Sequence, residues 1–200
     1  TVLLAGDMGL ELGGGRWARL LAQLLTATAP VYLALFSIFS MNAFDVLVWA
    51  GLVRIAARIL AGGSPRLWLA FGALAGLGLE NKIDVGLLGA GLAVGLVLAG
   101  RLDILRDRWL WLGFALAIAL FLPHVVWQAR HGWPTREFVA NAQRAKIAHL
   151  GPIAFGAAQF LLAGPVGFAF ALAGLGWLLG ARAARAFRPL GWAPVFVFAV

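Results

Sequence analysis

Residues Trp109–Ala129, WLWLGFALAIALFLPHVVWQA, form an apolar run without Lys, Arg, Asp or Glu. A bilayer core about 30 Å thick needs about 20 such residues in a helix. Comparable apolar runs recur on both sides of this one, along the whole chain. Helices fit these runs because lipid leaves an open backbone without hydrogen-bond partners, and the alternating pattern of a β-barrel is absent. The sequence therefore predicts an all-α, polytopic transmembrane helical bundle.

We expect six full spans and two partial ones in a single transmembrane domain that is truncated at both ends. The full spans are about 17–39, 43–60, 65–79, 85–99, 109–129 and 152–179, and the partial ones are 1–10 and 191–200. Between two of them, residues 130–150 form a long outward loop. There, Thr135 followed by Phe138 and Ala142 at helical spacing predicts a short helix that lies in the membrane interface.

Composition excludes several classes of protein. Hydrophobic residues make up 62% of the chain and charged residues 12%, whereas soluble domains have about 45–50% and 25%. The mean hydropathy is +0.92. The chain has no cysteine, which excludes a disulfide scaffold, a thiolate metal site and cysteine catalysis. A membrane protein without redox-active thiols remains.

The distribution of the Lys and Arg residues behind the net charge of +8 indicates which loops face the cytoplasm. Lys and Arg occur in short clusters between apolar runs, so we expect no nucleic-acid partner, which would require a continuous basic footprint. Alternate loops hold 11 and 5 of these residues. By the positive-inside rule, the arginine-rich set is cytoplasmic, and the set that begins with Lys82 faces outward.

Small residues and prolines predict how the spans are shaped. Two small-xxx-small pairs, Gly72/Gly76 and Gly91/Gly95, predict close helix approach. Proline lies inside three apolar runs, at Pro30, Pro123 and Pro165. Each of these prolines predicts a kinked helix.

A few ionisable residues lie where lipid alone would not tolerate them, since each costs about 2.5–3.5 kcal/mol on insertion scales. Asp45 stands at the outer start of span 43–60, and Glu80–Asp84 (ENKID) splits a long apolar stretch into two short runs. Short interrupted spans leave a water-accessible hollow near the surface. We therefore expect Asp45 and Lys82 to line the same outer cavity.

Each of these residues could instead have a purely structural role. Asp45 also suits a helix N-cap, and Asp84 suits a cap of the following span better than a reactive group. Lys82 could snorkel, or pair with Glu80 or Asp84. The basic outer loop suits lipid headgroups as well as a phosphate-bearing ligand. Its two histidines, His131 and His149, are too far apart to predict a metal site.

Four segments together resemble the bacterial membrane glycosyltransferases related to protein O-mannosyltransferases and the lipid A aminoarabinose transferase, which are GT-C-type enzymes. They are Glu11–Arg16 (ELGGGR), Ser40–Asp45 (SMNAFD), Leu77–Lys82 (LGLENK) and the stretch from Trp127 to Phe138 with HGWPT. The order and spacing of the spans are also similar. The resemblance covers residues from Leu10 to about Leu179.

This resemblance implies transfer of a sugar from a polyprenyl-phosphate carrier to a lipid, glycan or protein, outside the bacterial cytoplasmic (inner) membrane. It makes Asp45 a supporting catalytic carboxylate and Lys82 the donor-phosphate-binding residue. The residues around Lys82 depart from the family's Leu-Thr-Lys-Gly-like motif. The main catalytic carboxylate is expected upstream of Thr1, so this fragment alone should be inactive. Candidate substrate-binding residues are Glu80, Asn81, His131, Trp133 and Glu137.

The chemistry agrees with these residue types. A carboxylate orients the acceptor oxygen, and a lysine compensates the charge on the leaving phosphate. An apolar groove between helices would hold the isoprenoid tail. We expect an inverting enzyme without a cofactor or metal, whose partners are membrane lipids and the lipid-linked donor. The alternatives are a transporter or flippase for a lipid-linked or anionic substrate, and a non-catalytic scaffold.

Overall fold

The computed structural model describes residues 1–145 and 151–200. No strand occurs in these ranges, so the predicted all-α bundle is confirmed. The helices are α1 (Val2–Glu11), α2 (Arg16–Thr28), α3 (Pro30–Phe36), α4 (Met41–Leu60), α5 (Leu67–Asn81), α6 (Val85–Leu98), α7 (Leu102–Leu105), α8 (Arg108–Arg130), α9 (Pro134–Ala145), α10 (Pro152–Ala163), α11 (Pro165–Gly180), the 3₁₀ turn η1 (Arg185–Phe187) and α12 (Arg188–Ala199).

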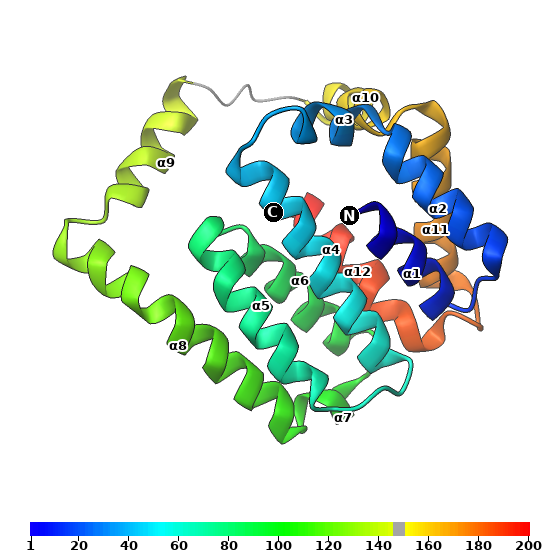
Figure 1. Ribbon diagram of the computed structural model, residues 1–200, viewed down its shortest axis with the longest axis horizontal. Helices are drawn as coiled ribbons and strands as arrows, with labels where there is room; N and C mark the ends of the chain where they lie inside the picture. Colours follow the sequence, from blue (N-terminus) through cyan, green and yellow to red (C-terminus); the bar gives the residue numbers. More distant parts are fainter. Residues whose placement is uncertain (146–150) are drawn as a thin grey trace.

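Helices α4, α5, α6 and α12 form the centre of the bundle (Figure 1). Helix α8 lies along α5 on one side, while α1, α2 and α11 lie on the other. The core consists of buried apolar side chains from the central helices, among them Leu52, Ala56, Leu60, Trp68, Leu88, Leu92, Leu190 and Ala193. These four helices are thereby held as one unit that positions the ends of α4, α5 and α6.

The central helices approach one another at glycines. A Cβ atom on Gly72 of α5 would lie 1.9 Å from the carbonyl oxygen of Gly113 in α8. Likewise, a Cβ on Gly95 of α6 would lie 2.4 Å from the carbonyl oxygen of Pro189 in α12. Only glycine allows backbones to come this close. The close packing predicted from the glycine pairs is confirmed.

Helix α8 is long and apolar enough to cross a membrane by itself. The bent pairs α2–α3 and α10–α11 meet the same criterion only when each pair is counted as one span. Their bends are 60° and 110°, and they fall where Pro30 and Pro165 begin a new helix. Helix α8, in contrast, continues through Pro123. The bilayer limits of the expected spans stay predictions.

Helix α9 begins after Trp133, so the short helix expected in the outward loop is present. Its place in the interface stays a prediction. Residues 146–150 of that loop, with Lys146 and His149, lie outside the described residues.

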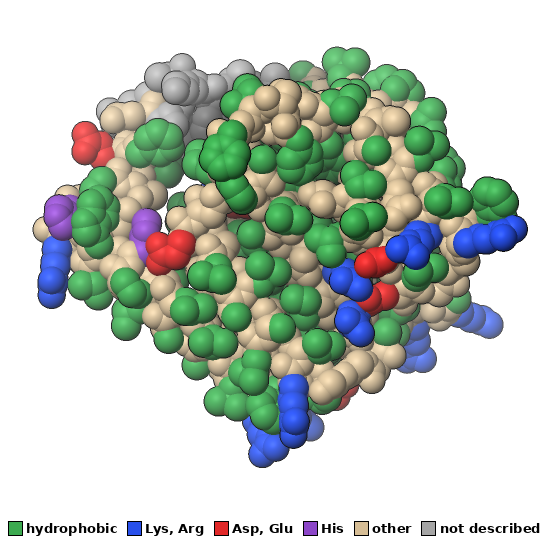
Figure 2. Space-filling view, viewed as in Figure 1, with side chains coloured by type: hydrophobic (Ala, Val, Ile, Leu, Met, Phe, Trp, Pro, Cys, Tyr) green, Lys and Arg blue, Asp and Glu red, His purple; other side chains and the backbone are tan. Residues whose placement is uncertain are grey.

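The surface of the bundle is largely apolar. Figure 2 shows hydrophobic side chains over most of the visible face, with Lys and Arg gathered mainly toward its lower and right-hand edges. On α8, large side chains such as Trp111, Phe114 and Leu122 are more than half exposed. Soluble monomers rarely expose so much contiguous apolar surface, which lipid covers readily. The surface therefore agrees with a membrane protein.

Candidate functional site at the ends of α4, α5 and α6

The sequence-predicted site lies where three helix ends meet. Helix α4 starts at Met41, α5 ends at Asn81, and α6 starts at Val85. The Asn81 side-chain amide donates a hydrogen bond of 2.9 Å to the carbonyl oxygen of Met41, which ties the end of α5 to the first turn of α4. Lys82 follows directly in an extended conformation. This tie holds the Lys82 turn beside α4.

Lys82 lies between two carboxylates. Its Nζ is 2.7 Å from Oδ2 of Asp84 and 3.3 Å from Oδ2 of Asp45. Asp45 is 8% exposed, although its side chain is ionisable and lies in an apolar helix. The structure thus brings Asp45 and Lys82, 37 residues apart in the chain, into direct contact. Their catalytic and phosphate-binding roles stay predictions.

These contacts decide between the structural alternatives. Ser40 occupies the N-cap position of α4, and Asp45 lies beyond the first turn, so the cap interpretation of Asp45 is wrong. Asp84 does occupy the N-cap position of α6, but its side chain makes no capping hydrogen bond. Its carboxylate instead pairs with Lys82, which is one of the two pairings that the sequence left open for the lysine. The other suggested partner, Glu80, contacts a different helix.

The environment keeps Lys82 charged. Burial by itself would lower the pKa of Lys82, but the hydrogen bond and charge of Asp84, together with the charge of Asp45, outweigh it. The pKa of Lys82 is therefore raised above its ordinary value. A lysine in this setting remains a cation throughout the physiological pH range.

A second polar cluster joins α5 to α8. Oε2 of Glu80 lies 3.5 Å from Nδ1 of His124, and Nε2 of His124 lies 3.1 Å from the side-chain nitrogen of Gln128. Gln128, which is 5% exposed, also contacts Thr135 at the start of α9. His124 and Gln128 were not predicted from the sequence. The signal was available, because they are the two polar side chains one helical turn apart in an otherwise apolar run.

The remaining candidate residues lie on α8 and α9. His131 stacks on Trp127 at 4.5 Å between ring centroids, and its Nδ1 is 2.8 Å from the Trp127 carbonyl oxygen. Trp133 is half-exposed, and Glu137 lies in the first turn of α9. Among the described residues, no hydrogen bond or ion pair joins these three side chains to Lys82 or Asp45. The structure does not bring them into one site with Lys82.

An apolar groove begins beside the Lys82 turn. It has a volume of about 730 Å³ and lies between α5, α6 and α8. Leu79 and Val85, which flank the turn, line one end, and Trp68 and Trp111 line the other. Along α5, residues 68–79 cover about 17 Å at 1.5 Å per residue. The groove is therefore long and narrow, with apolar walls.

Asp45 lines a separate cavity of about 400 Å³ together with Tyr32 and Trp49. Lys82 does not line this cavity, so the cavity of Asp45 is not the shared one that the sequence predicted, although the two side chains are in contact. In the part of the chain that the structure describes, no group of three or more His, Asp or Glu side chains is arranged to hold a metal ion. The expected independence from metals and cofactors stays a prediction.

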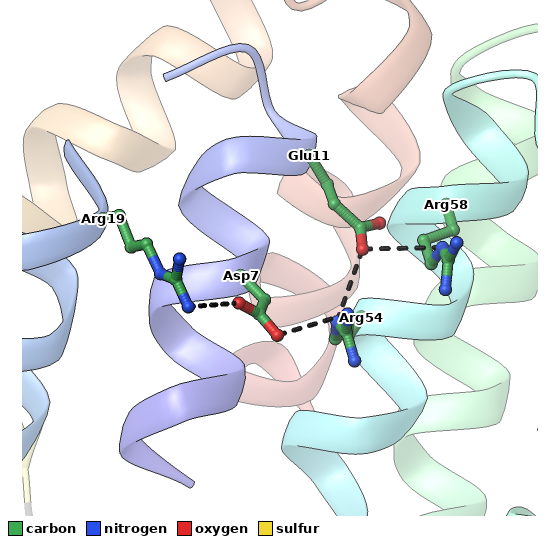
Figure 3. A network of polar contacts seen from close by, with 5 residues as sticks. All are labelled: Asp7, Glu11, Arg19, Arg54 and Arg58. Atoms are coloured by element: carbon green, nitrogen blue, oxygen red, sulfur yellow. Dashed lines mark ion pairs between the residues drawn. The ribbon is translucent and has the colours of Figure 1, made fainter. Parts of the chain in front are cut away.

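A network of ion pairs lies at the arginine-rich end (Figure 3). Asp7 of α1 pairs with Arg19 of α2 at 3.3 Å and with Arg54 of α4 at 3.2 Å. Glu11 pairs with Arg54 at 3.3 Å and with Arg58 at 3.5 Å. Asp7 lies within the apolar run of residues 1–10, which gives no local reason for a carboxylate, and the structure shows that it links three helices. Arg54 is therefore a structural cation as well as a topological signal.

The sequence model of the family described as dolichyl-phosphate-mannose-protein mannosyltransferase matches residues 12–127, more than half of the chain. The match includes Asp45, Glu80, Lys82 and His124, and it ends before α9. Comparisons with curated proteins and with solved structures find no match. The chain belongs to the dolichyl-phosphate-mannose-protein mannosyltransferase family and is an integral membrane glycosyltransferase of the GT-C type.

Proposed function

We propose that this protein transfers a sugar from a polyprenyl-phosphate carrier to a lipid, glycan or protein acceptor at the outer face of a bacterial cytoplasmic membrane. The observation that carries the proposal is the position of Lys82, a cation at physiological pH, in the turn between Leu79 and Val85, which line one end of a long apolar groove. A polyprenyl phosphate has the same two parts, an anionic head and an apolar tail. Family membership favours transfer over transport or a scaffold role.

The tail is assigned to the groove between α5, α6 and α8. Burying isoprenoid carbon is favoured by about 0.8 kcal/mol per CH₂ where water would otherwise contact it. A tail lying along α5 reaches the Lys82 turn with its phosphate, because Leu79 and Val85 line that end of the groove. Glycines in the groove walls, such as Gly86 and Gly89, leave room for its methyl branches.

The phosphate is assigned to Lys82. An ammonium group has three N–H donors, and two of them face Asp84 and Asp45. The third is available to the phosphate, whose negative charge grows as the bond to the anomeric carbon breaks. Asp45 holds the lysine in place and, as a supporting carboxylate, stabilises the oxocarbenium-like sugar. The bond between the anomeric carbon and the phosphate oxygen breaks with its electron pair left on that oxygen, the acceptor oxygen forms the new bond to the anomeric carbon, and the acceptor's proton passes to a general base.

The outward orientation rests on the distribution of cations. The arginine-rich helix ends lie together, as shown by the Arg19–Asp7–Arg54 network and by the Arg66 guanidinium 5.6 Å from the Trp109 ring centre. Lys82 lies at the other end of α5. By the positive-inside rule, the arginine-rich end is cytoplasmic and the Lys82 end faces outward.

The test uses full-length protein in proteoliposomes with polyprenyl-phosphate mannose and polyprenyl-phosphate glucose as donors. Lys82→Ala should lower release of polyprenyl phosphate by about 10²–10³-fold, the usual effect of removing one charge-stabilising donor. Arg106→Ala removes an exposed cation at the opposite end and should leave release unchanged. Wild-type turnover in a folded Lys82→Ala protein would exclude Lys82 from the site.

A further inference from the structure

The polar contacts that run from Thr135 through Gln128 to His124 have donors and acceptors that can be assigned. The backbone N–H of Thr135 lies 3.1 Å from Oε1 of Gln128 and can only donate, so it fixes which way the Gln128 amide points. The Gln128 nitrogen donates to Oγ1 of Thr135 and faces Nε2 of His124. His124 must therefore accept at Nε2 and carry its proton on Nδ1. Nδ1 is the ring nitrogen that lies 3.5 Å from Oε2 of Glu80.

The surroundings hold this arrangement in place. Phe121 stacks on the His124 ring at 5.0 Å with an angle of 15° between the planes. At the corner between α8 and α9, Gly132 and Trp133 both have positive φ, and the Trp133 N–H donates to the Gln128 carbonyl oxygen at 2.8 Å. A bulky residue at positive φ persists only where its surroundings enforce it. The corner thereby presents Thr135 to Gln128.

Glu80 lies at the end of this row of polar contacts, next to His124. Its side chain is 40% exposed, and only one of its two oxygens faces His124. It lies two residues before Lys82 and directly after Leu79, which lines the groove together with Phe121, the residue that stacks on His124. The contact with His124 is long, and such contacts tighten when a ligand is bound. A carboxylate with one oxygen free accepts hydrogen bonds from hydroxyl groups.

We propose that Glu80 binds hydroxyl groups of the transferred sugar, and that His124 and Gln128 are positioning residues that orient Glu80. This inference rests on the proposed function, because the donor head at Lys82 places the sugar beside Glu80. His124 is a fixed hydrogen-bond donor here, since a proton on its Nε2 would face the Gln128 amide N–H. The substrate class is a sugar that presents at least one hydroxyl at this rim.

The experiment compares Glu80→Gln, His124→Leu and His124→Asn in full-length protein, with polyprenyl-phosphate mannose and its monodeoxy analogues as donors. Glu80→Gln and His124→Leu should lower kcat/KM for the mannose donor about 10–100-fold and remove discrimination against one deoxy analogue. His124→Asn retains an N–H donor near the position of Nδ1, so it should keep most of the kcat/KM and most of the discrimination. Asp103→Asn, an exposed carboxylate at the opposite end, should change neither.

Binding of polyprenyl phosphate, which has no sugar, should be unchanged in all of these variants and lost in Lys82→Ala. Retained discrimination in Glu80→Gln, which alters no buried group, overturns the proposal even if His124→Leu fails to fold. Equal losses in His124→Leu and His124→Asn also overturn it, because they indicate a purely structural histidine. Full binding of polyprenyl phosphate by Lys82→Ala would instead refute the proposed function.

Discussion

Replacing Gly72 with alanine tests the backbone contact between α5 and α8. The new Cβ would lie 1.9 Å from the Gly113 oxygen, against 3.4 Å or more for ordinary contact, a shortfall of 1.5 Å. The obstacle is backbone, so the helices themselves must separate. A gap of 0.5–1 Å already forfeits about a quarter to a half of the dispersion energy across a contact. We therefore expect Gly72→Ala to lower the free energy of unfolding by about 1–3 kcal/mol.

The assay is thermal unfolding of the purified protein in detergent, where about 2–4 °C is lost per kcal/mol for a chain of 150–250 residues. Gly113→Ala should behave like Gly72→Ala, because its Cβ would lie 2.1 Å from the Trp68 oxygen. Gly76→Ala should cost less, since its nearest atom is the Leu120 Cβ at 2.8 Å. Gly174→Ala meets nothing within 4 Å and should be neutral or slightly stabilising. Equal effects across this series would refute the close approach of α5 and α8.

Three further predictions concern charged residues. Arg54→Ala leaves Asp7 and Glu11 without the cation that they share. It should lower the free energy of unfolding, measured by chemical denaturation, by about 1–3 kcal/mol. A loss no larger than that of Arg106→Ala would contradict the network. Asp107→Ala removes the acceptor for the Trp109 N–H at the start of α8 and should cost about 1 kcal/mol by the same measurement. Because the folded-state pKa of Lys82 is raised, its ion pairs stabilise fully below the unfolded value of about 10.4 and are lost as pH rises through the folded value. The stability difference between wild type and Lys82→Met should thus be constant from about pH 7 to 9 and shrink above about 10.4, and a difference that vanishes at neutral pH would contradict this.

The glycine pairs were interpretable from the sequence because helical spacing alone puts both members on one face. The same reasoning identified Asp45 and Lys82, since ionisable groups in apolar runs are costly and need a reason to be there. It could not find the roles of His124 and Gln128, because Glu80, the partner of His124, and Thr135, the partner of Gln128, come from other helices. Asp7 was unexplained for the same reason, as its partners Arg19 and Arg54 belong to α2 and α4.

Local rules also left the bends open. Pro30, Pro123 and Pro165 lie in similar apolar runs, yet the helix breaks at the first and third and continues through the second. Pro165 follows Gly164, whose φ of 74° ends α10, and Pro30 follows Ala29 in an extended conformation, whereas Pro123 lies inside α8, which continues with one backbone hydrogen bond fewer.

By itself, the sequence determined that the chain is helical and lies in a membrane, because each apolar run must satisfy its own backbone hydrogen bonds in lipid. It also determined which helices pack through glycine and which end is rich in arginine. Only the tertiary structure decided that Lys82 is held by Asp45 and Asp84, that Glu80 faces His124, and that a groove opens beside them. These contacts join residues from separate helices, and their geometry depends on how the helices pack, which no local pattern encodes.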